Sequence, residues 1–118
     1  MTGDGEAEFH FAVRPGYPSG EPAKIDSWNV LIRGKLDAVT TRHLIEAIDR
    51  LHGRLTLDIN DVTTIDPDAF ELVLELQDRL ESTGSALWLR GVRGRFSDVF
   101  RIVGGEHRFH IEDERLQS

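Results

Sequence analysis

Alternation of apolar and polar residues predicts two strands near the start of the chain. Every second residue from Phe9 to Val13 is apolar, which is typical of a strand with one buried face. Residues 14–27 include three prolines and two glycines, and this composition predicts a loop that is longer than most. The mainly apolar run 28–33 predicts the second strand, which we expect to end at Gly34.

A helical period follows the second strand. Thr40 or Thr41 can cap the start of this helix with a side-chain oxygen, and Gly53 suits its end. The predicted buried face consists of Leu44, Ile45, Ala47, Ile48 and Leu51. The first helix is therefore expected to follow Leu36-Asp37 and to pack on the sheet through this face.

A strand and a longer helix come next. Residues 55–59 carry apolar side chains at alternate positions, as interior parallel strands do. The second helix is predicted to begin at Asp66 or Pro67, because proline at the first helical position costs no hydrogen bond. It should run to about Ser82, and its core face consists of Ala69, Leu72, Val73, Leu76 and Leu80.

The remaining pattern predicts a strand at 86–89, a third helix over 92–103 and a short strand with Phe109 and Ile111. Strand–helix–strand units need parallel strands and right-handed crossovers, whereas the first two strands, joined by a loop, are most simply antiparallel. The predicted fold is therefore α/β, with a mixed sheet and three crossover helices in a single domain.

The ends of the chain differ in composition from the predicted domain at 9–111. Residues 1–8 are small, polar and acidic, and we expect a disordered tail there. Residues 112–118 are predicted to form a polar tail. The chain has no transmembrane-length apolar run and no basic-then-apolar leader pattern, so a cytoplasmic location without membrane insertion is expected.

Charge and composition narrow the function classes. The net charge is −7, which disfavours nucleic-acid binding. The chain has no cysteine, which excludes disulfides, thiolate zinc sites and a cysteine nucleophile. The spacing of His107 and His110 points them to opposite faces of a strand, and Ser85 and Ser97 lack a nucleophile-elbow context. We therefore expect no enzyme activity, cofactor or metal site.

A turn rich in carboxylates opens the second helix. Asp66, Pro67 and Asp68 follow a strand directly, and acidic residues are favoured in the first turn of any helix by about 0.3–1 kcal/mol. Arg90, together with Arg93 and Arg95, follows the fourth strand. In a parallel sheet these arginines can lie near the aspartates and offset their charge, bind an acidic group of a partner, or form a solvated helix end.

Four segments in this order resemble the STAS domain, the family of sulphate transporters and anti-sigma-factor antagonists. They are the residues 30–37 (VLIRGKLD), 55–62 (LTLDINDV), 65–70 (IDPDAF) and 99–104 (VFRIVG). The resemblance extends over residues 28–111. It implies a domain that binds a serine-kinase anti-sigma factor and is inactivated by phosphorylation of a serine or threonine at the turn.

The turn departs from the family pattern at the phosphoacceptor. By position, Asp66 matches the family's aspartate, Pro67 the first serine and Asp68 the phosphorylated serine. Asp37 matches an acidic residue beside the phosphoacceptor. The chain therefore has no hydroxyl at either serine position. Asp68 either mimics the phosphorylated form or belongs to a surface that binds constitutively, unless it only stabilises the helix start.

Further residues extend the predicted surface. Phe70 and Leu74 lie away from the centre of the second helix's core face; packing is favoured for Phe70, and Leu74 is open between packing and partner contact. Thr63 or Thr64 offers an alternative phosphate acceptor. The predicted partner surface consists of Asp37, Asp66, Pro67, Asp68, Phe70, Leu74, Arg93 and Arg95.

The resemblance predicts a protein-interaction module in bacterial regulation. Its expected partner is a protein such as an anti-sigma factor or serine kinase, and the sequence leaves the oligomeric state open. Two alternatives are a cytoplasmic STAS subunit of a lipid or anion transport assembly, and a STAS domain that binds a small ligand or nucleotide through the arginines.

Overall fold

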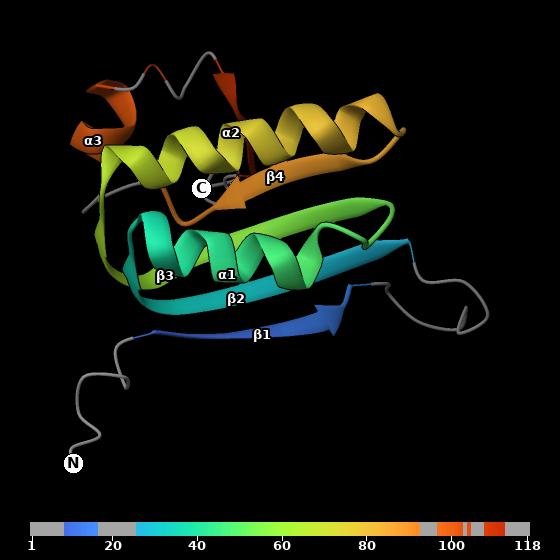
Figure 1. Cartoon of the computed structure of the whole chain (residues 1–118), viewed down its shortest axis with the longest axis horizontal. Coiled ribbons are helices and arrows are strands. Elements are labelled where there is room, and N and C mark those ends of the chain that lie inside the picture. Colours follow the sequence, from blue (N-terminus) through green and yellow to red (C-terminus); the bar gives the residue numbers. More distant parts are fainter. Residues whose placement is uncertain (1–8, 17–25, 93–96, 103, 105–107, 113–118) are drawn as a thin grey trace, which may run out of the picture.

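The computed structural model describes residues 9–16, 26–92, 97–102, 104 and 108–112. Strands and helices alternate along these residues after an initial pair of strands (Figure 1). Their bounds are β1 Phe9–Pro15, β2 Ser27–Leu36, α1 Ala38–Ile48, β3 Arg54–Ile65, α2 Pro67–Ser82, β4 Ala86–Arg90, α3 Ser97–Ile102 and β5 His110–Glu112.

The five strands form one mixed sheet in the order β1-β2-β3-β4-β5. β1 pairs with β2 antiparallel, and every other neighbouring pair is parallel. The predicted fold class is therefore confirmed, including the antiparallel first pair and the crossover helices. Because parallel strands need crossovers, α1 and α2 each connect the carboxyl end of one strand to the start of the next.

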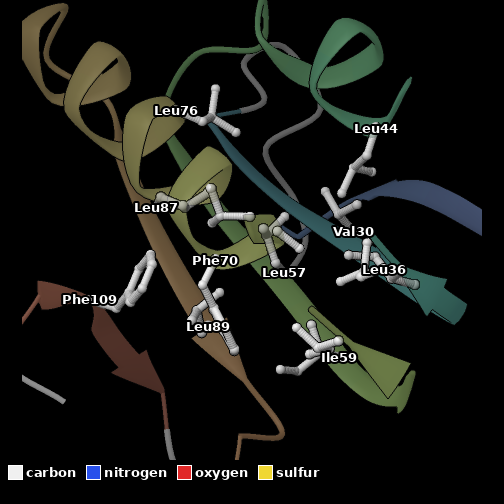
Figure 2. Close-up of a cluster of buried hydrophobic side chains, with 14 of the residues drawn as sticks. Val30, Leu36, Leu44, Leu57, Ile59, Phe70, Leu76, Leu87, Leu89 and Phe109 are labelled. Atoms are coloured by element: carbon white, nitrogen blue, oxygen red, sulfur yellow. The ribbon is translucent and has the colours of Figure 1, made fainter. Parts of the chain in front are cut away.

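α1 and α2 lie side by side on one face of the sheet (Figure 1). The apolar side chains of β2, β3 and β4 alternate toward these helices, which gives the strands one buried face. Figure 2 shows Leu76, Leu87, Leu57 and Leu44 converging between the layers. The other face of the sheet has no helix on it among the described residues.

β2 and β3 are longer than the sequence predicted. Gly34 was expected to end β2, yet the strand continues to Leu36 and the pairing with β3 shifts register on either side of Arg33 and Gly34. β3 runs to Ile65 and includes Asn60 and Asp61, residues that are depleted in strands. Pairing with the neighbouring strand overrides their weak propensity, since the ladder extends to Leu36 and Ile65.

α1 begins earlier than predicted. The residue that caps it is Asp37, not Thr40 or Thr41, so the helix starts at Ala38. Its last helical residue is Ile48, and the predicted end at Gly53 is wrong. Leu44, Ile45 and Ile48 are buried as predicted, whereas Ala47 is exposed and Leu51, beyond the helix, is half-buried.

α2 agrees closely with its prediction, whereas α3 does not. α2 begins at Pro67 and ends at Ser82, and its buried face includes Ala69, Val73, Leu76 and Leu80; Leu72 is half-buried. α3 is described from Ser97 to Ile102. Val92, two residues after the end of β4, is buried and is not helical, so the predicted helix start at 92 is wrong. Phe100 is buried as predicted, whereas Phe96 and Val103 lie outside the described residues.

A polar network crosses the sheet face that has no helix on it. The guanidinium of Arg90 pairs with Asp58 at 3.7 Å and with Glu112 at 3.2 Å, and Arg54 pairs with Glu112 at 3.1 Å. Arg54 also lies over the Trp88 ring, 4.3 Å from its centroid. Three strands are thus joined by charged and aromatic side chains on this face, beyond their backbone hydrogen bonds.

Candidate protein-interaction site at the helix starts

The carboxyl ends of β2 and β3 lie next to each other. Leu36 pairs with Ile65 in the parallel ladder, and the backbone amide of Asp66 donates to the carbonyl oxygen of Leu36 at 3.0 Å. The residues that precede α1 and α2 are therefore neighbours. Both helices start at the same edge of the sheet (Figure 1), the edge at which ligands and partners bind in many α/β proteins.

The start of α1 is closed by a reciprocal pair of hydrogen bonds. The amide of Thr40 donates to Asp37 Oδ1 at 2.9 Å, and the amide of Asp37 donates to Thr40 Oγ1 at 3.0 Å. These bonds form a capping box, which satisfies amides that a helix start leaves unpaired. Thr40 Oγ1 also lies 2.8 Å from the carbonyl oxygen of Lys35, to which it can donate.

The Asp37 carboxylate is stabilised in its charged form. The hydrogen bond from the Thr40 amide lowers the pKa of Asp37, and although partial burial raises it, the Thr40 hydroxyl and the nearby Lys35 lower it further. Lys35 Nζ lies 3.9 Å from Asp37 Oδ2. Asp37 therefore places a negative charge at this edge through the neutral pH range.

The start of α2 is arranged differently. Asp66 occupies the capping position but its side chain makes no capping hydrogen bond, and Pro67 is in the first turn. Asp68 is exposed, and its carboxylate has no hydrogen bond or ion pair with any residue that the structure describes. Among the described residues, the electrostatic attraction of the helix start is the remaining interaction that stabilises this carboxylate.

An exposed apolar residue, Val39, lies two positions after Asp37 in the chain. Val39, in the first turn of α1, is 62% exposed. We call Asp37, Val39, Asp66, Pro67 and Asp68 the helix-start surface. Val39 was not predicted as part of this surface, because the predicted cap of α1, Thr40 or Thr41, lies three or four residues after the observed cap, Asp37. With Asp37 as cap, the 100° step puts Val39 opposite the buried face.

Phe70 and Leu74 belong to α2 and pack against the core. Phe70 is 4% exposed, and its ring centroid is 5.8 Å from that of Phe100 and 6.0 Å from that of Phe109. The packed interpretation of Phe70 is confirmed, so its ring supports the start of α2 and is not offered to a partner. Leu74 is half-buried against the core.

The arginines that follow β4 are only partly described. Arg90 was expected near Asp66 and Asp68, but its guanidinium pairs with Asp58 and Glu112 on the opposite face of the sheet. The alternation of side chains along β4 accounts for this, since Leu89 faces the helices and Arg90 does not. Arg93 and Arg95 lie outside the described residues, and so does His107.

The described residues offer little for small-molecule or metal chemistry at this edge. No three histidine or acidic side chains gather there in a way that could hold a metal ion. An entirely apolar cavity of about 10 Å³ lies under α2, lined by Leu36, Ile65 and Ala69 among others. Known ligand pockets have volumes of about 300–1,000 Å³. None of the described helices is long and apolar enough to cross a membrane.

Similar folds occur in anti-sigma factor antagonists. The chain superposes on the unphosphorylated form of the anti-sigma factor antagonist SpoIIAA with a TM-score of 0.63 at 16% identity, covering 75% of this chain and 79% of that one. For the phosphorylated form of the Bacillus cell fate determinant SpoIIAA the TM-score is 0.56 at 17% identity, with 75% and 82% covered.

A third structure and a family model complete the comparison. The antisigma-factor antagonist STAS domain from Rhodobacter sphaeroides gives a TM-score of 0.60 at 12% identity, with 77% of this chain and 97% of that one covered. These identities establish the fold alone. No curated protein matches the chain. The family model described as "Mlab, STAS domain" matches residues 19–112. The chain belongs to the STAS domain family.

Proposed function

We propose that this STAS domain is a protein-interaction module of bacterial regulation that docks a partner through the helix-start surface. The observation that carries the proposal is the exposed Asp68 carboxylate, which has no partner among the described residues and lies in the first turn of α2. Asp37 and Val39 add a second charge and an apolar contact at the start of α1. A charged rim around an apolar contact is a common composition for a protein interface.

Asp68 gives this module a fixed charge where its relatives have a removable one. The family resemblance aligns Asp68 with the phosphorylated serine of the antagonists, and SpoIIAA itself has been described in both unphosphorylated and phosphorylated forms. A phosphate adds about −1.5 to −2 charge at neutral pH, and an aspartate adds −1. We propose that the partner accepts this charge and that binding is constitutive. Thr63 and Thr64, both exposed, remain candidates for a separate phosphorylation.

The expected partner is an anti-sigma factor or a related serine kinase, and the expected location is the cytoplasm. We propose no catalytic activity and no cofactor. The alternative of a STAS subunit in a transport assembly uses the same surface and predicts a different partner. Identifying the partner therefore distinguishes the two functions, whereas measuring how tightly the helix-start surface binds does not.

The test is affinity purification of the tagged full chain from its native cells, with mass spectrometry of the proteins retained. Asp68→Arg reverses the charge at the proposed contact. Glu75→Arg makes the same change at an exposed position two turns further along α2 and serves as the matched control. We expect an anti-sigma factor or kinase with the wild type and Glu75→Arg, and its loss with Asp68→Arg. Recovery of transport proteins instead would support the alternative function, a STAS subunit of a transport assembly.

A further inference from the structure

β1 is an outer strand of the sheet and differs from the opposite edge. It pairs with β2 on one side, and no described residue lies on its other side. β5 at the other edge is three residues long, whereas β1 has seven residues in an unbroken register with β2. A long and regular edge is a template for pairing with another strand.

The backbone groups that β1 directs outward can be identified. The amide of Gly16 donates to the carbonyl oxygen of Ser27 at 2.7 Å, which makes these residues a hydrogen-bonded pair of the antiparallel ladder. Hydrogen-bonded and non-hydrogen-bonded pairs alternate in such a ladder. Phe9, Phe11 and Val13 therefore direct their amides and carbonyls away from β2, which gives three donors and three acceptors along the outer edge.

β1 has few of the features that protect sheet edges from pairing. It contains no lysine, no bulge interrupts its register with β2, and its single proline is the last residue, Pro15. Its one full charge is Arg14, next to that end. Phe9, Phe11 and Val13 are half-buried on the face toward the helices, so part of their apolar surface is still open to a neighbour.

We propose that a second copy of this chain pairs antiparallel with β1 around a two-fold axis at Phe11. This register places Phe11 opposite Phe11 of the second copy and Phe9 opposite its Val13. All three outward-facing residues then form hydrogen-bonded pairs, and aromatic and β-branched side chains meet, which favours cross-strand packing. The two Arg14 side chains lie at opposite ends of the ladder, so no like charges face each other across it.

The size of this contact sets its strength. The register pairs residues 9–13 of the two copies, and this ladder of five described residues on each side is small beside the 1,200–2,000 Å² buried in stable protein interfaces. The dimer is therefore weak, with a dissociation constant of roughly 10–100 μM, and its formation depends on protein concentration. The helix-start surface lies on the helices and strand ends, so the pairing leaves it open to a partner.

Disulfide trapping tests the register, because the natural chain has no cysteine. In the proposed dimer the two copies of position 11 are about 5.5 Å apart between Cα atoms, which is within disulfide range. The two copies of position 12 are diagonal neighbours, about 7–8 Å apart, which is beyond that range. Under a mild oxidant, Phe11→Cys should form a covalent dimer at least about tenfold faster than the control Ala12→Cys. Equal rates would contradict the proposed register.

Sedimentation of the wild-type chain over a range of concentrations tests the dimer itself. Val13→Pro removes an outward amide that the monomer does not use, so the fold should persist while the dissociation constant rises about tenfold or more. In Ala12→Pro the lost amide belongs to the β1–β2 ladder, and the variant should unfold at a lower temperature than Val13→Pro. A wild type that stays monomeric to about 1 mM would overturn the proposal.

Discussion

The backbone amide of Asp66 donates to the carbonyl oxygen of Leu36 across 3.0 Å. This bond joins the residue that caps α2 to the residue before Asp37, the cap of α1. Two helix starts, separated by a complete helix and strand in the sequence, thereby become one surface. The helix-start surface is a consequence of the β2–β3 register, which ends with Leu36 opposite Ile65.

Thr40 holds the first half of this surface in place. Thr40→Val keeps the side-chain volume but removes the hydroxyl that accepts from the Asp37 amide. The loss should cost about 1–2 kcal/mol of unfolding free energy, measured by chemical denaturation. Thr63→Val is the control, because Thr63 is exposed and its hydroxyl has no hydrogen bond in the described structure; it should change stability by less than about 0.5 kcal/mol. Equal losses of unfolding free energy in both variants would show that the capping box does not stabilise the start of α1.

Gly91 allows β4 to leave the sheet close to β3. Its φ is +87°, and a Cβ there would lie 2.8 Å from the backbone nitrogen of Asn60. Gly84 has a similar φ of +90°, but a Cβ there would have no neighbour within 4 Å. Gly84→Ala should therefore cost about 1–2 kcal/mol from backbone strain alone. Gly91→Ala should cost more than Gly84→Ala in thermal or chemical unfolding, and a smaller cost would show that the strand exit is not tightly packed.

Glu112 links stability to pH. Burial alone would raise the pKa of this carboxyl, but the hydrogen bonds and charges of Arg90 and Arg54 outweigh burial and hold the pKa below its ordinary value. The stabilisation is present above the unfolded-state pKa and is lost as the pH falls through the lower folded-state value. Glu112→Gln should be less stable than wild type at pH 7 by about 0.5–1 kcal/mol.

The same difference should disappear in acid. Protonated Glu112 and glutamine are both neutral, so denaturation curves of the two proteins should converge as the pH falls below about 4. A stability difference that is unchanged from pH 7 to pH 3 would show that the two arginines do not stabilise the charged form of Glu112.

Asp68→Ser tests whether the fixed charge replaces a switch. The resemblance to the antagonists predicts that a cognate anti-sigma kinase phosphorylates this variant, because serine restores a hydroxyl in the first turn of α2. Wild type should incorporate no phosphate at this position. Intact-mass spectrometry after incubation with the kinase and ATP measures both results. If the wild type and Asp68→Ser bind the kinase equally well and neither is modified, Asp68 is not the equivalent of a switch.

The sequence predicted the helix-start surface unevenly, for identifiable physical reasons. Pro67 determines where α2 begins through its fixed φ and missing amide, so the predicted start at Asp66 or Pro67 includes the observed one. α1 has two residue types that can cap a helix within four positions, Asp37 and Thr40, and the sequence pattern favoured the wrong one. Val39 was missed as a result of that choice.

The ends of β2 and β3 could not be predicted from the local sequence pattern. Gly34 and Asp61 have weak strand propensity, yet both lie inside the β2–β3 ladder. The same holds for Arg90. The alternation of side chains along β4 decides on which face of the sheet its side chain lies, and its ion-pair partners belong to the neighbouring strands. Pairing between strands, which is a tertiary interaction, determined these features.

The most direct test of the account is amide hydrogen exchange of the full chain, free and bound to the partner identified by affinity purification. We predict slower exchange on binding at residues 38–40 and 68–70, in the first turns of α1 and α2, and no change at Ser82–Gly84 at the far end of α2. Protection confined to the open face of the sheet or to β1, with the two helix starts unchanged, would contradict docking through the helix-start surface.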